Sequence, residues 1–261
     1  MGSADSASAS NRLLSPSDPS PFRVTNSGAV ARLLFVGDHA GRAIPGRLVN
    51  LGLTGADLDR HIAWDIGVEG LGSGLATTLG ACFVRQTYSR LVIDCNRRPG
   101  APDSIPPTSD GSPIPGNADL TASQKRARFR EIYQPYHRQI RKELSARKRA
   151  GPGAVLVALH SFTPVFQGAP RPWRFGVLHR GDSPFSNRML AAMKRSLGAA
   201  VGDNQPYAMD ASDNTVPLHA GPGDIDYLEI EVRQDLIADE AGQAAVRDLL
   251  AAFLDEARAG G

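Results

Sequence analysis

Apolar runs that alternate with amphipathic helical segments constrain most strongly what this chain can fold into. The runs "ARLLFVG", "GAVLVAL" and "DYLEIEV" have the length and composition of buried strands and lie at residues 31–37, 153–159 and 226–232. Segments with helical spacing of apolar residues lie between and after them, at residues 119–151, 183–200 and 239–259. Strands that alternate with helices build a sheet covered on both faces. We therefore expect a single α/β domain with a mixed, mostly parallel sheet flanked by helices.

Other stretches carry weaker structural signals. We expect one helix from Thr54, which can cap its start, to Gly80, which can end it. The stretch at 82–99 indicates a strand pair or a bent strand, and 174–180 indicates a short strand. In the long helix, Pro135 predicts a kink or a break, because proline has no N–H group to donate.

Two segments carry no clear pattern of strand or helix. Residues 1–21 are rich in serine and alanine and have no apolar core, which predicts a disordered tail ahead of one folded domain at 22–261. Residues 99–117 are dense in proline, glycine and serine. A loop of this length in a compact domain is usually functional or disordered, so we expect either a lid over a site or a linker.

Charge and cysteine content exclude several classes of function. Lys+Arg 29 against Asp+Glu 27 gives a formal net charge of +2, which does not favour a nucleic-acid partner. The two cysteines, Cys82 and Cys95, form no CxxC pair, which fits a reducing compartment and a cytoplasmic location. No apolar run approaches the roughly 18 residues that a membrane span needs, so we expect no membrane partner. The oligomeric state is not indicated.

Polar side chains gather where the expected strands end. In open α/β sheets, ligands bind at the carboxyl ends of the strands, so these positions are candidates for a site. They are Asp38 and His39, then Asp94, Asn96, Arg97 and Arg98, then His160 and Ser161, and finally Glu229, Glu231, Arg233 and Asp235. Four such endings in one chain favour a shared site over separate buried polar groups.

Two histidines with a carboxylate are the usual ligands of a hydrolytic zinc site. His39 and His160 are the best-placed histidines, although each by itself could be a core histidine bonded to the backbone. A third ligand is needed. His61 and Asp65 are four residues apart, on one face of the expected helix, where they either face the site or pair with each other.

Two further groups have both a functional and an ordinary interpretation. Glu229 and Glu231 lie on the same face of their strand, which is either a buried face with a general base or an exposed face. The cluster Asn96, Arg97 and Arg98 either forms surface ion pairs or binds an anionic substrate. Since the planar guanidinium matches a carboxylate, its position at a strand end favours substrate binding.

The chain resembles the N-formylglutamate amidohydrolase family over roughly residues 22–257. The resemblance rests on a set of short motifs, which include "DHAGRAIP", "LGLTGADLDRHIAWDIG", "YSRLVIDCNRRP", "SIPPTSDGSPIPGN", "LHSFTP", "GDNQPY" and "IEVRQDLI". The family is similar to the zinc carboxypeptidases and aspartoacylases, which implies an α/β fold of the zinc-carboxypeptidase type that carries one zinc ion.

The resemblance also implies roles for individual residues. "LHSF" implies that His160 is a zinc ligand, "DCNRRP" that Asn96 and Arg97 hold the substrate carboxylate, and "IEVRQD" that Glu231 rather than Glu229 is catalytic. Arg90 is expected to bind the substrate carbonyl. Ser161 and Tyr207 are expected to contact the substrate, and Arg98 is expected to bind it together with Arg97. Zinc carboxypeptidases carry His-x-x-Glu, but here Arg42 replaces that glutamate. We therefore place the remaining ligand on Asp65, with His61 as the alternative.

Together these features predict a zinc-dependent amidohydrolase that acts on a small anionic N-acyl amino acid, such as an N-formyl amino acid. The expected ligands are His39, Asp65 and His160, and Glu231 is the expected general base. Two alternatives stay open. The chain could be a zinc peptidase or cell-wall amidase on the same fold, or a binding protein without catalytic activity.

Overall fold

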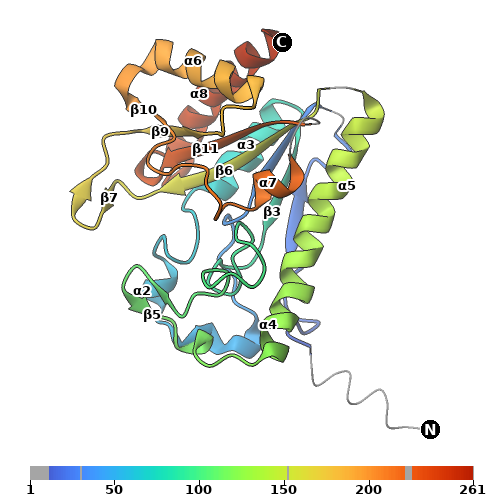
Figure 1. The fold of residues 1–261 in the computed structure, drawn as a ribbon, viewed down its shortest axis with the longest axis vertical. Coiled ribbons are helices and arrows are strands. Elements are labelled where there is room, and N and C mark those ends of the chain that lie inside the picture. Colours follow the sequence, from blue (N-terminus) through green and yellow to red (C-terminus); the bar gives the residue numbers. More distant parts are fainter. Residues whose placement is uncertain (1–11, 30, 152, 221–224, 261) are drawn as a thin grey trace.

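The computed structural model of the protein describes residues 12–29, 31–151, 153–220 and 225–260. Its centre is a seven-stranded sheet in the order β1-β3-β2-β6-β11-β9-β10 (Figure 1). The strands are β1 (Phe22–Thr25), β3 (Cys82–Gln86), β2 (Leu33–Gly37), β6 (Val155–Phe162), β11 (Asp226–Arg233), β9 (Phe175–Leu178) and β10 (Val201–Asp203). Strands β3, β2, β6 and β11 run parallel to one another, whereas β1 and β9 run antiparallel to their inner neighbours. The mixed, mostly parallel sheet is confirmed.

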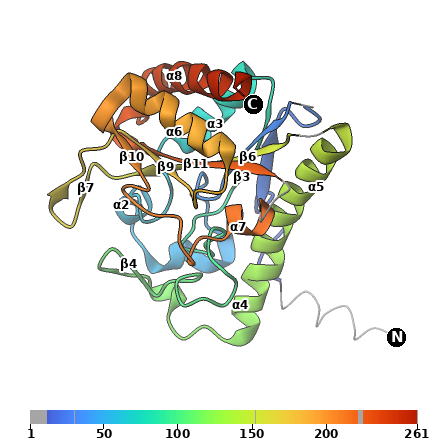
Figure 2. The same cartoon turned by 45° about the horizontal axis from the view of Figure 1, so that its top comes forward.

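Alternation along the strands divides the core into two layers. Val155, Val157 and Leu159 of β6 point to one face, where they join the core formed by α3 (Val68–Thr78), α6 (Pro184–Leu197) and α8 (Glu240–Ala259). Leu156 and Ala158 point to the other face, which α5 (Gln134–Ala150) covers. Figure 2 shows α3, α6 and α8 together on one side of the sheet and α5 on the other. His160 follows the even-numbered residues and lies on the α5 side.

The expected single helix at 54–80 is wrong. The chain forms a short α2 (Gly55–Leu58), then turns, and begins α3 only at Val68. Gly67 has a φ of 83°, a left-handed conformation that an α-helix cannot contain. The amide of Asp65 instead donates to the carbonyl of His39 at 2.8 Å. This hydrogen bond brings the intervening turn beside the end of β2.

The expected strand pair at 82–99 is wrong beyond β3, which ends at Gln86. Residues 90–99 form turns, including bonds from the amide of Val92 to the carbonyl of Ser89 and from the amide of Arg97 to that of Asp94. Asp94 and its neighbours therefore lie in an irregular segment after β3 rather than at the end of a strand.

The long helix at 119–151 is present but changes its hydrogen-bond pattern once. It begins with α4 (Ala122–Arg128), continues as a π-helical turn at Phe129–Tyr133, and then becomes α5. Pro135 follows this turn directly, and proline cannot donate to the carbonyl four residues earlier, that of Glu131. A change of helical pitch, rather than a break, accommodates the proline.

Residues 99–117 are ordered and anchored. They contain the hairpin β4 (Thr108–Ser109) and β5 (Ser112–Pro113) and a short 3-10 helix at Pro115–Asn117. The buried Arg128 donates to the carbonyls of Val92 and Gly116 and to the Asn117 side chain, at 2.6–3.0 Å. The base of the loop is therefore fixed to α4.

The expected tail divides into two parts. Residues 1–11 lie outside the described residues. Residues 12–21 contact the domain: Leu13 is buried, and the amides of Leu13 and Leu14 donate to the Glu131 carboxylate at 2.9–3.1 Å.

The remaining elements are short. They are the hairpin β7 (Val165–Phe166) and β8 (Ala169–Pro170), the helix α7 (Thr215–His219), and 3-10 helices at Gly46–Gly52, Gly198–Ala200 and Gln234–Leu236. None of the helices in the described ranges is long and apolar enough to span a bilayer.

Candidate active site

A pocket of about 300 Å³ opens at the carboxyl ends of the central parallel strands. His39 follows β2, His160 and Ser161 end β6, and Glu229 and Glu231 lie in β11. The irregular segments around residues 90–97 and 207–213 close the pocket from the other sides. Three strands and the irregular segments beside them, which are far apart in sequence, thus supply polar side chains to one space, as expected for an open α/β sheet.

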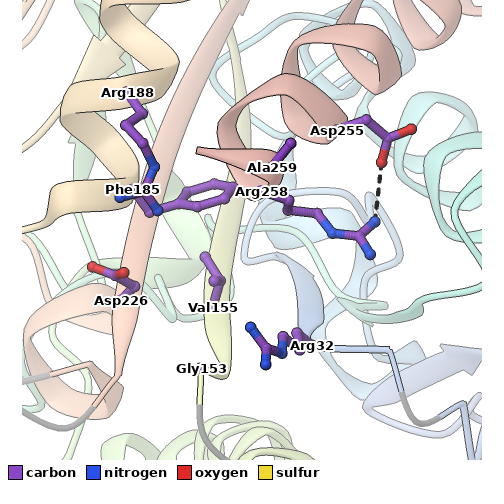
Figure 3. A pocket seen from close by; sticks show the side chains of 9 residues that line it. All are labelled: Arg32, Gly153, Val155, Phe185, Arg188, Asp226, Asp255, Arg258 and Ala259. Atoms are coloured by element: carbon purple, nitrogen blue, oxygen red, sulfur yellow. Dashed lines mark hydrogen bonds and ion pairs between the residues drawn. The ribbon is translucent and has the colours of Figure 1, made fainter. Parts of the chain in front are cut away.

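A different hollow, of about 610 Å³, lies at the opposite, amino ends of β6 and β11 (Figure 3). Arg32, Arg188 and Arg258 surround it beside Phe185, and Arg258 pairs with Asp255 at 3.0 Å. Its described lining residues include no histidine, cysteine or glutamate. The residues with catalytic potential therefore gather at the carboxyl edge of the sheet.

His39, Asp65 and His160 converge in the carboxyl-edge pocket. All three are buried, and one candidate ligand atom from each lies within 4.8 Å of the others. The Nδ1 atom of His39 lies 3.5 Å from Asp65 Oδ2, and the Nδ1 atom of His160 lies 3.0 Å from the same oxygen. The two imidazole rings meet edge to face, with centroids 4.9 Å apart. One carboxylate oxygen and two Nδ1 atoms thus face a common point.

The other nitrogen of each histidine faces a second buried carboxylate. His39 Nε2 donates to Asp94 Oδ1 at 2.7 Å, and His160 Nε2 lies 3.5 Å from Asp38 Oδ2. A carboxylate behind the imidazole fixes its tautomer and leaves Nδ1 free to bind a metal. His39 Nδ1 indeed finds no hydrogen-bond partner among the residues that the structure describes. His160 differs, because its Nδ1 is hydrogen-bonded to Asp65 Oδ2 at 3.0 Å and its Nε2 has no hydrogen-bond partner among those residues.

These donors fit a divalent metal ion. In tetrahedral coordination with bonds of 2.0–2.1 Å, neighbouring ligand atoms lie about 3.3 Å apart, close to the 3.5 and 3.0 Å that separate Asp65 Oδ2 from the two Nδ1 atoms. Asp65 Oδ1 is held by the Arg90 guanidinium, which leaves Oδ2 as the oxygen directed at the histidines. The arrangement of two imidazoles and one carboxylate leaves room for a fourth ligand, as catalytic zinc sites do.

Electrostatics hold the carboxylates of this cluster in the ionised form. Burial opposes ionisation of Asp65, but Arg90 and His39 lower its pKa well below its ordinary value. Burial likewise opposes ionisation of Asp94, but His39 lowers its pKa. These two carboxylates are therefore ready to accept hydrogen bonds or to bind a cation at neutral pH.

His61 and Asp65, the two candidates for the third metal ligand, differ in their position. His61 lines the pocket, but its Nδ1 lies 3.7 Å from Asp65 Oδ1, whereas the other two histidines approach Oδ2. Burial lowers the pKa of His61 to about 4, so it is neutral at pH 7. Arg42, in the place of the carboxypeptidase glutamate, turns outward to pair with Asp59 at 2.8 Å and lies over the Trp64 ring. The geometry groups Asp65, not His61, with His39 and His160.

Two glutamates face the same space from β11. Glu231 pairs in register with His160, and Glu229 lies two residues earlier on the same face. Both are buried, and the Oε2 atom of each has no hydrogen-bond partner within the described part of the chain. Burial raises the pKa of Glu231 to about 7 and that of Glu229 to about 8. A carboxyl group with a pKa near 7 can both accept and release a proton at neutral pH.

Arg97 and Asn96 border the pocket but already have partners. Arg97 pairs with Asp103 at 2.9 Å and lies 3.6 Å from Asp213. The Asn96 side-chain oxygen accepts from the amides of Asn214 and Thr215 at 3.1 and 2.9 Å. Asn96 therefore holds the segment that leads into α7, and Arg97 supplies the cationic group at this end of the pocket.

The other expected substrate-binding residues are placed differently. Tyr207 lines the pocket, and its hydroxyl accepts from Arg171 at 2.9 Å. Ser161 also lines it, but its hydroxyl donates to the carbonyl of Ile66 at 3.0 Å. Arg98 is exposed and is not among the residues that line the pocket.

Sequence reasoning gave no role to Asp38 and Asp94, the carboxylates behind the two histidines. Their location next to expected strand ends was visible, but their pairing with particular histidines was not. Thr215 was missed entirely; its hydroxyl donates to Asp38 Oδ1 at 2.8 Å and so orients the carboxylate that faces His160. These contacts span 55, 122 and 177 residues, beyond the range of any local motif.

Known proteins resemble this chain in sequence and in fold. The family model described as N-formylglutamate amidohydrolase matches residues 31–238. A search of curated proteins gave no match. The crystal structure of gene product Atu2144 from Agrobacterium tumefaciens is 36% identical, with a TM-score of 0.91, and the match covers 95% of this chain and 99% of the other. The N-formylglutamate amidohydrolase from Ralstonia eutropha JMP134 is 20% identical, with a TM-score of 0.68 over 93% of this chain and 100% of the other, which shows a shared fold.

Family membership supports an amidohydrolase activity, and the resemblance drawn from the motifs is confirmed. The chain belongs to the N-formylglutamate amidohydrolase family.

Proposed function

We propose that the protein is a zinc-dependent amidohydrolase that cleaves the amide of an N-acyl amino acid. One observation carries the proposal: two imidazole Nδ1 atoms and one carboxylate oxygen converge beside a buried glutamate whose Oε2 has no partner among the described residues. Zinc is the metal most often held by two histidines and a carboxylate in hydrolases. His39, Asp65 and His160 would hold it, and it would polarise the amide carbonyl and lower the pKa of water.

Glu231 is the proposed general base and acid. It would accept a proton from the water that attacks the amide carbon and deliver that proton to the amide nitrogen as the C–N bond breaks. The products are a carboxylic acid and a free amine, so the atoms of water and substrate balance. The pKa of about 7, which burial produces, suits both halves of this transfer.

Arg90 and Arg97 would orient two different groups of the substrate. Arg90 lies against Asp65 and can donate to the carbonyl oxygen as negative charge develops on it. Arg97, with Asn96, would bind the carboxylate of the amino-acid part, which would take the place of Asp213 beside the guanidinium. This pairing explains why the substrate should be an anion, and N-formyl-L-glutamate is the first compound to test.

The test combines metal content with turnover. Wild-type protein and the variants His39→Ala, His160→Ala and Glu231→Gln would be loaded with zinc, and metal content measured by mass spectrometry. Hydrolysis of N-formyl-, N-acetyl- and peptide substrates would be followed by release of free amine. His179→Ala is the matched control, because His179 also contacts a carboxylate, Asp203 at 2.9 Å, but lies outside the pocket.

We expect the two ligand variants to lose zinc, and Glu231→Gln to keep zinc but lose about 10²–10⁴-fold in kcat. The control should keep both. Full zinc retention in both ligand variants would remove the proposed site, and normal turnover in Glu231→Gln would remove the proposed base. Zinc binding without hydrolysis of any substrate would favour a binding protein, and cleavage of peptides alone would favour a peptidase.

A further inference from the structure

Next to the catalytic pocket lies a larger hollow of about 670 Å³, here called the outer chamber. His61, Arg90 and Tyr207 line both spaces, so the two adjoin at these side chains. The other walls come from three surface segments, at residues 59–62, 109–111 and 163–167, and from Ile66 and Gln234. A formyl group has a single carbon atom and needs none of this room.

Apolar side chains that are otherwise rare on the surface gather in this chamber. Among the described residues, five large hydrophobic side chains are exposed, and Val165, Phe166 and Tyr207 of these line the chamber. Ile62 and Ile66 line the same space. Exposed apolar groups that cluster around one cavity mark a binding surface rather than random surface composition.

Two of these rings are held in place. The buried Arg171 lies over both Phe166 and Tyr207, 4.7 and 4.9 Å from the ring centroids, and donates to the Tyr207 hydroxyl. A cation over an aromatic face stabilises that arrangement. Because the rings are fixed before a ligand arrives, less conformational entropy is lost on binding.

The charged groups of the outer chamber already have partners. Asp59 pairs with Arg42 at 2.8 Å, and Arg60 pairs with Asp110 at 3.3 Å. Gln234 Oε1 has no hydrogen-bond partner within the described ranges, but it is a neutral acceptor that suits an N–H or O–H group. Arg90, at the border with the catalytic pocket, pairs with Asp65. Among the described residues that line the chamber, Asp59, Arg60, Arg90 and Asp110 thus each have an oppositely charged partner.

The position of the outer chamber indicates that it would contact the acyl side of a bound substrate. Arg97, the proposed anchor of the carboxylate, lines only the catalytic pocket, whereas Arg90, the proposed partner of the carbonyl, lies where the two spaces meet. A substrate held at both points would extend its acyl group past Arg90 and away from Arg97. We propose that the outer chamber binds a neutral, apolar acyl group of several carbon atoms, so that the preferred substrates are long-chain or aromatic N-acyl amino acids.

This inference rests on the proposed amidohydrolase function and is tested by comparing acyl groups on one amino acid. The substrates are the N-acetyl, N-hexanoyl and N-phenylacetyl derivatives of L-glutamate, whose amide bonds differ little in reactivity, together with N-formyl-L-glutamate. The zinc-loaded wild type is used for kcat/KM. Calorimetry with the zinc-loaded Glu231→Gln variant, in which hydrolysis should be slow, gives the Kd of the same compounds. Each methylene removed from water strengthens binding by up to about fourfold. We expect kcat/KM for the hexanoyl or phenylacetyl compound to exceed that for acetyl by at least about tenfold.

The preference ratio is the kcat/KM, or the affinity 1/Kd, of the hexanoyl or phenylacetyl compound divided by that of the acetyl compound. Phe166→Ser should lower this ratio severalfold in both measurements. Val49→Ser is the matched control, because Val49 is also an exposed apolar residue but lines neither space; it should leave the ratio unchanged.

A ratio of one or less would overturn the inference, as would a ratio that Phe166→Ser does not alter. Hydrolysis of the short substrates with no preference would overturn the inference alone. If no substrate is hydrolysed, the proposed function fails, and the Kd ratio still decides whether the chamber binds apolar acyl groups. If Phe166→Ser changes only the oligomeric state measured by light scattering, the apolar wall is an interface between copies and the inference fails.

Discussion

Replacing Asp94 with asparagine tests whether the carboxylate behind His39 prepares that imidazole for the proposed zinc ion. Asp94 Oδ1 accepts from His39 Nε2 at 2.7 Å and also from the amide of Asn96 at 2.8 Å. Asparagine can keep an oxygen in this position, so both hydrogen bonds can survive. What disappears is the negative charge that favours the Nε2–H tautomer and raises the basicity of Nδ1.

The expected magnitude follows from the strength of that contact. A hydrogen bond to an ionised group contributes about 1.5–3 kcal/mol and is roughly twice as strong as a neutral one. Its replacement by an amide should therefore cost about 1–1.5 kcal/mol of zinc binding, or about a tenfold increase in Kd. Asp38→Asn should cost less, because Asp38 lies 3.5 Å from His160 Nε2 rather than 2.7 Å.

The assay is competition for zinc between the protein and a chromophoric chelator at pH 7.5. The matched control is Asp203→Asn, which removes the charge behind His179, a histidine outside the pocket whose Nε2 lies 2.9 Å from Asp203. Its zinc affinity should equal that of the wild type. The reasoning would be refuted if Asp94→Asn bound zinc within twofold of the wild type, or if Asp38→Asn lost more affinity than Asp94→Asn.

Three other perturbations test the fold around the site. Burial lowers the pKa of His137 to about 4 and that of His219 to about 3. A histidine in the unfolded chain has a pKa near 6.5, so below this pH the unfolded protein binds more protons than the folded protein. Their contribution to stability is complete above pH 6.5 and is lost as pH falls toward 4 for His137 and toward 3 for His219. His219→Gln should remove up to about 1.4 kcal/mol per pH unit of this dependence, measured by urea unfolding. Gly41→Ala would place a Cβ 2.2 Å from the carbonyl oxygen of Thr87 and should lower the free energy of unfolding by about 1–3 kcal/mol or more. Arg128→Met leaves two buried acceptors and one partly buried acceptor without a donor. It should cost about 3 kcal/mol and expose residues 99–117 to proteases.

Each of these has a clear contrary result. The protonation argument would be contradicted if the difference in free energy of unfolding between His219→Gln and the wild type were the same at pH 7.5 and at pH 5.5. A Gly41→Ala protein as stable as the wild type would mean that the backbone at Thr87 moves without cost. Unchanged proteolysis of Arg128→Met would mean that the loop is held by contacts other than those to Arg128.

Several features of this protein follow from the sequence alone. The central strands are continuous apolar runs because they are buried on both faces, and such runs are visible without a structure. Parallel strands bring their carboxyl ends to one edge, so His39, His160 and Glu231 were expected to lie near one another. The motifs also indicated the family before any structural comparison.

The tertiary structure decided which carboxylates serve which histidines. A helical pattern at 54–80 predicted one helix, but Gly67 turns left-handed and the amide of Asp65 bonds to the carbonyl of His39. Local spacing cannot reveal this turn, because the bond that stabilises it reaches the turn after β2, 26 residues earlier in the chain. The turn is what brings Asp65 to the two histidines.

The same limit explains the segment after β3 and the carboxylates behind the histidines. Strand propensity extended the prediction to residue 99, whereas turns at 90–99 place Asp94 against His39. Sequence periodicity gives the face on which a side chain lies, but its partner depends on how distant segments pack. The sequence therefore determined the sheet and the edge where the site lies, and only the tertiary packing paired Asp94 with His39 and set Asp38 opposite His160.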